Sequence, residues 1–163
     1  MSCRGVFFAI EKSDSKKLRK CKNDEELVEY IEENIEEEWE KEWLCETDKS
    51  WDAMHRCFAE GKLELVGGIP PLNSTIFGGE ILNTESDYYV SLKDNKLVKK
   101  IGKEILLINR EKLRSLYNKI SNDYQGDLND EDFDYTWEWF ESVKEFYIKV
   151  AQSKRDIIFT VDQ

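Results

Sequence analysis

Hydrophobic residues along this chain recur at two spacings, which predict helices packed around short strands. Residues 5–10 (Gly-Val-Phe-Phe-Ala-Ile) form a short apolar run near the N-terminus, and residues 157–161 (Ile-Ile-Phe-Thr-Val) form another near the C-terminus. Apolar runs of this length, rich in β-branched and aromatic residues, are typical of buried strands. We expect the two strands to lie in the same sheet.

A four-residue hydrophobic repeat predicts a long helix after the first strand. Asn23, with Glu26 three residues later, resembles a capping box at its start. A shorter basic helix, capped by Ser13 and reaching Cys21, is expected before it. Glutamates cover the remaining sides of the long helix, whose core-facing residues would be Leu27, Ile31, Ile35, Trp39 and Trp43.

The middle of the chain combines one clear helix with a region of weak signals. Thr47 is expected to cap a helix that runs through Glu60 and is stopped by Gly61. Residues 62–90 contain two glycine pairs and a proline pair, and are predicted to form a loop with one or two short extended pieces. Such a loop is a natural place for a groove.

Two further helical regions are expected in the second half. Residues 91–120 fit a helix pair with a break near Asn109, although the apolar pattern alone leaves 104–108 open to being a strand. After a polar, acidic stretch at 123–134, a long helix is expected with acidic residues at its start and basic residues at its end. Its inner side would be formed by Phe133, Trp137, Phe140, Tyr147 and Ala151.

Two short motifs identify a family resemblance. Trp51, Asp52 and His55 stand in the expected helix that follows Thr47, and Gly78, Gly79 and Glu80 form a later Gly-Gly-Glu turn. With the aromatic C-terminal helix and terminal strand, they make the chain similar to the YfbM-like family of small bacterial proteins, whose members have no assigned activity. Two segments depart from the family pattern: the glutamate-rich helix at 24–43 and the lysine-rich segment at 93–103.

The resemblance implies a fold but no reaction. It implies one α/β domain over residues 1–163, helix-rich and packed around a small mixed sheet, with α+β as the alternative. It also favours a helix at 104–108. No catalytic residue transfers from the family.

Charge is concentrated in one segment. The net charge of the chain is −11, and residues 24–48 alone hold thirteen carboxylates against one cation, Lys41. A face of one sign repels phosphate backbones, so direct nucleic-acid binding through it is not expected, whereas docking of a basic protein is favoured. The alternative is that the acidic helix only keeps the protein soluble. The expected partner-binding face comprises Glu29, Glu33, Glu36, Glu37 and Glu40.

His55, the only histidine, admits three interpretations. It is a hydrogen-bonded core residue beside Trp51, it lines a ligand groove, or it pairs with Asp52 at i, i+3 as a general base with Glu80 as a second carboxylate. The structural interpretation is favoured, because Asp52 also serves as a first-turn anion at the helix N-terminus. We therefore assign no catalytic residue.

The four cysteines give no metal or redox motif. Cys3, Cys21, Cys45 and Cys57 are too widely spaced for paired zinc ligands, and free, mostly buried thiols are expected. No metal and no cofactor is expected.

Two functions follow as hypotheses. The first is a non-enzymatic interaction protein whose acidic helical face binds a basic partner, in the manner of bacterial immunity proteins. The second is a small-molecule-binding or hydrolytic domain with a groove around Trp51, Asp52, His55, Gly78, Gly79 and Glu80. Without a signal-like N-terminus or a membrane-length apolar run, a cytoplasmic protein is expected. The oligomeric state is left open.

Overall fold

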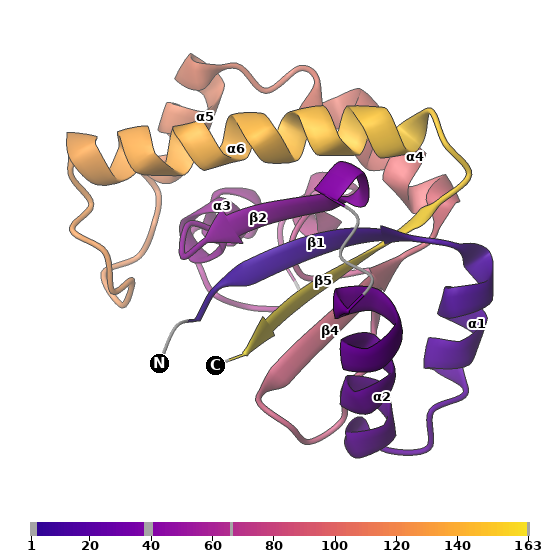
Figure 1. The fold of residues 1–163 in the computed structure, drawn as a ribbon. Helices are drawn as coiled ribbons and strands as arrows, with labels where there is room; N and C mark the ends of the chain where they lie inside the picture. The colour runs from indigo at the N-terminus through magenta and orange to yellow at the C-terminus, as the bar shows by residue number, and fades with distance from the viewer. Residues whose placement is uncertain (1–2, 38–40, 66, 163) are drawn as a thin grey trace.

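The two terminal strands lie side by side at the centre of the sheet, as the sequence predicts. In the computed structural model, which describes residues 3–37, 41–65 and 67–162, β1 (Gly5–Ile10) pairs with β5 (Asp156–Asp162). The strand order is β2-β1-β5-β4-β3 (Figure 1). The helix-rich α/β fold class is thereby confirmed.

The other elements follow one another closely along the chain. They are α1 (Lys12–Arg19), α2 (Asp24–Ile31), the π-helix η1 (Glu32–Glu36), the 3₁₀ turn η2 (Lys41–Trp43), β2 (Leu44–Asp48), α3 (Trp51–Phe58), the 3₁₀ turn η3 (Leu72–Ser74), β3 (Glu80–Ile81), β4 (Tyr88–Lys93), α4 (Asn95–Ile105), α5 (Arg110–Tyr117) and α6 (Asp130–Ala151).

Every pairing between the described strands is antiparallel, which corrects the expectation of a mixed sheet. The register explains it. Lys93, the last residue of β4, lies opposite Ile157 near the start of β5. The chain therefore leaves the sheet after β4, forms α4, α5 and α6, and re-enters the sheet at the same end. β5 consequently runs antiparallel to β4.

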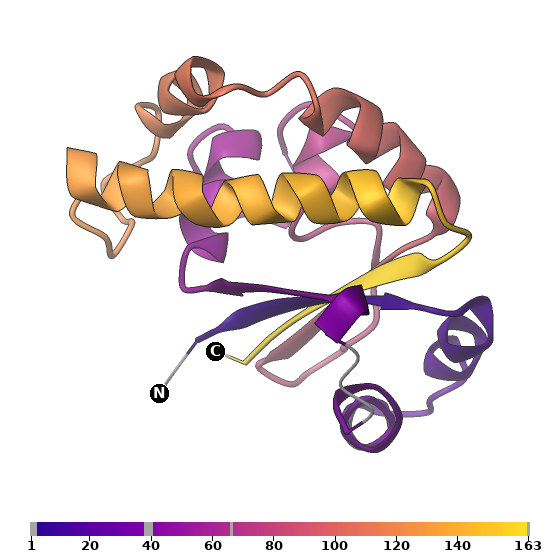
Figure 2. The same cartoon turned by 45° about the horizontal axis from the view of Figure 1, so that its top comes forward.

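Helices cover both faces of the sheet. Successive side chains of a strand point to opposite faces. Phe7 and Ala9 of β1 accordingly belong to the core beneath α3, α4, α5 and α6, whereas Phe8 and Ile10 belong to a second core beneath α1 and α2. Figure 2 shows the two helical layers on either side of the strands.

The glutamate-rich helix is shorter than predicted. Its start is confirmed, because the Asn23 side chain accepts a hydrogen bond from the Glu26 amide at 2.9 Å. Regular α-helix ends at Ile31 and continues only as η1. Trp43 lies in η2, and Trp39 is outside the described residues. The four-residue hydrophobic repeat therefore continues in the sequence beyond the residues that form the helix.

Two predicted helix caps are wrong. Thr47 lies in β2, where its hydroxyl donates to the Gly5 carbonyl at 2.8 Å, and α3 begins four residues later at Trp51. Ser13 lies inside α1, which begins at Lys12. Residues 44–48 form a strand because they pair with β1. No pattern in the neighbouring sequence indicates this pairing.

The second half follows the prediction for helices and departs from it for one strand. The helix pair is confirmed as α4 and α5, with the Asn109 side chain accepting from the Lys112 amide at 2.8 Å. Residues 104–108 form no strand; α4 ends at Ile105. β4 extends to Lys93, in a segment that was expected to lie within the helical region.

No described helix combines the length and the apolar character that crossing a bilayer requires.

Candidate functional site

Helix α3 holds the tryptophan and the histidine that the sequence singles out, and both rings are interior. Trp51 is 4% exposed and His55 is 1% exposed. The Trp51 indole N–H donates to the Cys3 carbonyl at 2.7 Å. Its ring meets Phe77 edge-on, with 5.5 Å between centroids, and lies 6.3 Å from Phe159 of β5. Trp51 thus ties α3 to the sheet.

The His55 imidazole is held by one backbone carbonyl. Its Nε2 bonds to the carbonyl oxygen of Glu64, which can only accept, so Nε2 carries the proton. Nδ1 is buried with no partner among the described residues. Burial lowers the pKa of His55, although the bond to Glu64 opposes this, and Lys93 lowers it further. The ring is therefore a neutral core group that packs edge-on against Phe77 at 5.1 Å.

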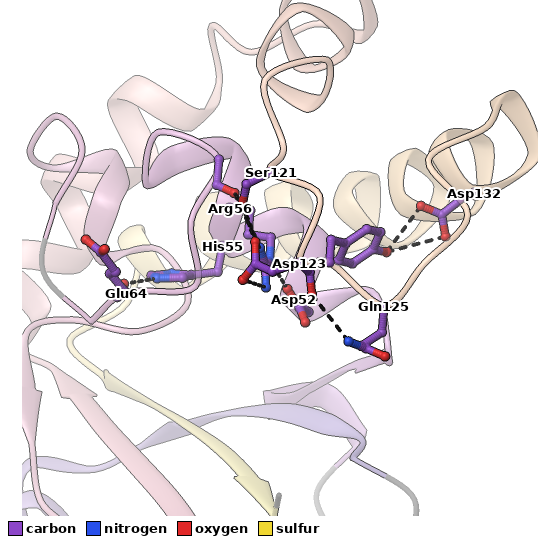
Figure 3. A network of polar contacts seen from close by, with 10 residues as sticks. Asp52, His55, Arg56, Glu64, Ser121, Asp123, Gln125 and Asp132 are labelled. Atoms are coloured by element: carbon purple, nitrogen blue, oxygen red, sulfur yellow. Dashed lines mark hydrogen bonds and ion pairs between the residues drawn. The ribbon is translucent and has the colours of Figure 1, made fainter.

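Asp52 pairs with Arg56 and not with His55. The Arg56 Nε donates to Asp52 Oδ1 at 2.6 Å, and its Nη1 donates to Asp123 Oδ1 at 2.9 Å and to Ser121 Oγ at 3.1 Å. Arg56 is only 3% exposed. In Figure 3 the His55 ring points away from this cluster toward Glu64. The Asp52–His55 pair that the catalytic interpretation required is not formed, because Arg56, at i+4, offers the carboxylate a full positive charge.

The two carboxylates that hold Arg56 differ in their environment. Burial raises the pKa of Asp52, and Arg56 opposes that shift. Hydrogen bonds from Arg56 and Ser121 lower the pKa of the exposed Asp123 to about 2. Both carboxylates are engaged by the same guanidinium, so the cluster is built as a paired ion network.

A third carboxylate, Asp132, extends the network to α6. Tyr124, whose ring lies 5.6 Å from the Arg56 guanidinium, donates to Asp132 at 3.2 Å. Tyr117 of α5 donates to the same carboxylate. The connected side chains therefore join α3, α5, the 121–125 loop and α6, which is the arrangement of a structural clamp.

The Gly-Gly-Glu turn lies at the edge of the sheet. Gly78 and Gly79 have φ values of +125° and +69°, which favour glycine, and a Cβ on Gly79 would lie 2.4 Å from the Leu92 carbonyl oxygen. Glu80, in β3, accepts from Arg19 of α1 at 2.8 Å. The turn leads directly into β3, and the Glu80 carboxylate faces α1.

These positions correct the expectation of one open groove. Rings as deeply buried as Trp51 and His55 do not line a groove, Asp52 is held by Arg56, and Glu80 is engaged by a different helix. The structural interpretation of His55 is the one that agrees with its burial. Of the clamp residues, only Arg56 had a sequence signal, its i, i+4 spacing from Asp52; Asp123 lies 67 residues away.

Lys93 is a buried amine that the sequence did not indicate. It has no exposed surface, and its Nζ donates to the Ile76 carbonyl and, at 2.6 Å, to the Ser91 hydroxyl. Phe7 and Phe159 lie 5.8 and 5.7 Å from the nitrogen. Burial lowers the pKa of Lys93 well below its usual value. The alternation of β4 places it in the core, where its stem serves as apolar packing.

The predicted acidic face is mostly exposed. Glu29, Glu33 and Glu37 are exposed, and Glu36 is half-buried and accepts a hydrogen bond from the Tyr88 hydroxyl at 3.0 Å. Glu40 lies outside the described residues.

The thiols are free, as predicted, with Cys45 and Cys57 buried and Cys3 and Cys21 half-buried. Burial raises the pKa of Cys45 to about 12 and that of Cys57 further, so neither is a ready nucleophile. Within residues 3–37, 41–65 and 67–162, no three His, Cys, Asp or Glu side chains are grouped as a metal site would require.

Comparisons with known proteins agree with this fold. A family model described as "Domain of unknown function (DUF1877)" matches residues 1–160. The crystal structure of YfbM from Escherichia coli, a protein of unknown function, superposes with a TM-score of 0.67 at 16% sequence identity, covering 97% of this chain and 99% of that one. No curated protein matches. The resemblance to the YfbM-like family is confirmed, and at this identity the structural match shows the fold alone.

Proposed function

Because the chain belongs to the family of domains of unknown function DUF1877, whose description names no activity, we propose a function from its own surface: a non-enzymatic interaction protein that binds a basic protein partner through α2 and η1. The binding surface, called the acidic face below, consists of Glu25, Glu29, Glu33 and Glu37.

The observation that supports the proposal is the row of exposed, unpaired carboxylates. The four glutamates recur every fourth residue and all are exposed. Among the side chains that the structure describes, which do not include that of Lys41, no cation lies within ion-pair distance of any of the four, whereas Glu80 and Glu42 elsewhere pair with Arg19 and Lys149. The row can therefore meet charges on another molecule.

This arrangement works against the helix that carries it. Like charges at i, i+4 destabilise a helix by about 0.2–0.5 kcal/mol a pair. The last turn of α2 contains no basic residue, and Glu32 to Glu36 follow it, at the end where the helix dipole is negative. A basic partner would neutralise this repulsion. The carboxylates would then stabilise the complex, whereas they destabilise the helix in the free protein.

The opposite side of α2 and η1 is buried in the core. Leu27, Ile31 and Ile35 pack with Phe8 and Ile158 against the sheet. The carboxylates consequently stand on a rigid, pre-formed surface, and a partner would not have to order it. Asp24 adds to this rigidity by accepting the backbone N–H groups of residues 84–86, which lowers its pKa to about 2.

The test compares two triple variants with the same charge change. Glu29→Lys/Glu33→Lys/Glu37→Lys alters the acidic face, and Glu131→Lys/Glu138→Lys/Glu141→Lys alters exposed positions on α6, across the sheet. Binding to a small basic ribonuclease is measured by surface plasmon resonance at ~20 mM and ~300 mM NaCl. The acidic-face variant should bind ~10-fold or more weakly, and salt should slow association.

The matched α6 variant separates this surface from bulk charge. If binding depends on the acidic face, the α6 variant should lose only a small part of its affinity. Equal weakening by both triples would show that net charge alone attracts the ribonuclease, and the proposed surface would be rejected. The proposed surface would also be rejected if binding were unchanged by salt and by the acidic-face substitutions.

A further inference from the structure

A mainly apolar cavity of about 510 Å³ lies on the other side of the sheet, between α3, α5 and residues 68–72. This volume is within the range of small-molecule sites, about 300–1,000 Å³. The groove predicted from sequence lay elsewhere on α3. The apolar part of the lining consists of Cys57, Phe58, Ile69, Leu72, Ile108 and Leu116.

Two close backbone approaches fix the walls of the cavity. A Cβ on Gly61 would lie 2.0 Å from the Lys119 carbonyl oxygen, and a Cβ on Gly68 would lie 2.0 Å from the Phe58 carbonyl oxygen. Both glycines have positive φ, +86° and +78°. The amide of Ser121 also donates to the Gly61 carbonyl at 3.0 Å. The cavity is therefore held open by the fold and does not need a ligand to form it.

Its mouth is apolar and open to solvent. Ile69, which lines the cavity, is 77% exposed. Its side chain therefore leaves apolar surface at the mouth that a ligand would cover.

The charge at the rim of the cavity indicates which kind of molecule would bind there. Lys112 and Lys119 are exposed lining residues from α5 and the residues just after it, and neither has an ion-pair partner in the described ranges. On the same helix, Arg110 and Arg114 pair with carboxylates of α6. Glu60 is the only carboxylate among the residues that line the cavity. With Lys112 and Lys119, the lining residues carry a net charge of +1, in a protein of net charge −11.

We propose that this cavity binds a small amphipathic carboxylate, with its hydrocarbon chain against Phe58, Leu72 and Leu116 and its anionic head at Lys112 and Lys119. The spacing of Lys112, Leu116 and Lys119 at i, i+4 and i+7 places all three on one side of α5 and its extension. At about 30 Å³ for each water-sized group, the cavity holds roughly 15 non-hydrogen atoms, enough for a chain of about ten carbons.

The proposal does not depend on the acidic face. α2 and η1 pack on the core formed with Phe8 and Ile158, on the opposite side of the sheet from α3 and α5 (Figure 2). Loss of ribonuclease binding would leave the carboxylate site untouched, and the converse also holds.

Octanoate binding tests the proposal, measured by isothermal titration calorimetry and by ¹H–¹⁵N NMR, with octylamine as the matched cation. Octanoate should bind saturably at ~1 mM or below and shift amides of residues 57–61, 68–72 and 108–119. Octylamine should bind at least ~5-fold more weakly, because it brings a like charge to the lysines. No saturable octanoate binding, or equal binding of octylamine, would overturn the proposal.

Variants locate the site. Lys112→Gln/Lys119→Gln should weaken octanoate binding ~5-fold or more, whereas Lys99→Gln/Lys100→Gln on α4, which makes the same charge change at exposed positions, should not. Leu116→Trp should fill the cavity and abolish binding. If that variant fails to fold, the solvent-exposed lysine pair still decides the question. Unchanged binding in the Lys112/Lys119 variant rejects the anion-binding rim.

A lipid surface is the competing occupant. Co-sedimentation with phosphatidylglycerol vesicles, without saturable binding of free octanoate, would assign the exposed aliphatic residues to a membrane and overturn the proposal.

Discussion

At the scale of single residues, burial decides the chemistry of His55. The ring is flanked by Phe77, held by the Glu64 carbonyl and 1% exposed. Its lowered pKa means that the native state binds a proton less readily than the unfolded chain, whose histidine titrates near about 6.5. The stability from the neutral ring is therefore present above about pH 6.5 and is lost as pH falls through the lower native pKa.

His55 should consequently resist protonation. Because it is the only histidine, its ring signals in an NMR titration need no assignment by mutation. Their midpoint in the folded protein should lie below the midpoint in urea, which should be near about 6.5. The stability advantage of the wild type over His55→Gln should shrink as the pH falls through the folded-state midpoint. A folded-state titration at or above 6.5 would contradict the buried, neutral ring.

At the scale of elements, local signals located the helix starts that depend on a side-chain cap. Asn23 and Asn109 cap α2 and α5 as their sequences predict, since an Asn side chain reaches an amide three residues on without help from the fold. β2 and the part of β4 beyond residue 90 were missed for the opposite reason. Each depends on a neighbour distant in sequence, β1 and β5 respectively, that no local pattern reveals.

The junction between α3 and α5 gives an element-scale prediction. Gly61→Ala would bring a Cβ against the Lys119 carbonyl, and Gly67→Ala would meet nothing closer than the Glu64 carboxylate at 3.8 Å. Both glycines have positive φ, so both substitutions should cost about 1–3 kcal/mol of backbone strain. Gly61→Ala should cost more, because α5 must also move. Urea unfolding measures both, and equal losses would show that the junction is not tightly packed.

At the scale of the whole molecule, the two proposed binding sites lie on opposite sides of the sheet. The acidic face lies with α1 and α2, and the lysine-rimmed cavity lies with α3 and α5. A net charge of −11 makes self-repulsion a general cost to the folded state.

Salt should therefore stabilise the protein. Raising NaCl from ~20 mM to ~300 mM should raise the thermal midpoint by a few degrees, since the Debye length shrinks below the spacing of the repelling carboxylates. Glu29→Gln/Glu33→Gln/Glu37→Gln should reduce this gain more than Glu131→Gln/Glu138→Gln/Glu141→Gln, because the first set stands in one row. An equal response of both variants to salt would contradict repulsion along the acidic face.

The sequence by itself determined the terminal strands, the helix start at Asn109, the long C-terminal helix and the concentration of negative charge at 24–48. These features depend on periodicity, capping and composition, which act over a few residues. Only the tertiary structure decided that Asp52 holds Arg56 together with Asp123, that Lys93 is interior, and that α3 and α5 enclose an apolar cavity. Each of these joins groups far apart in sequence, whose meeting is set by the packing of whole elements.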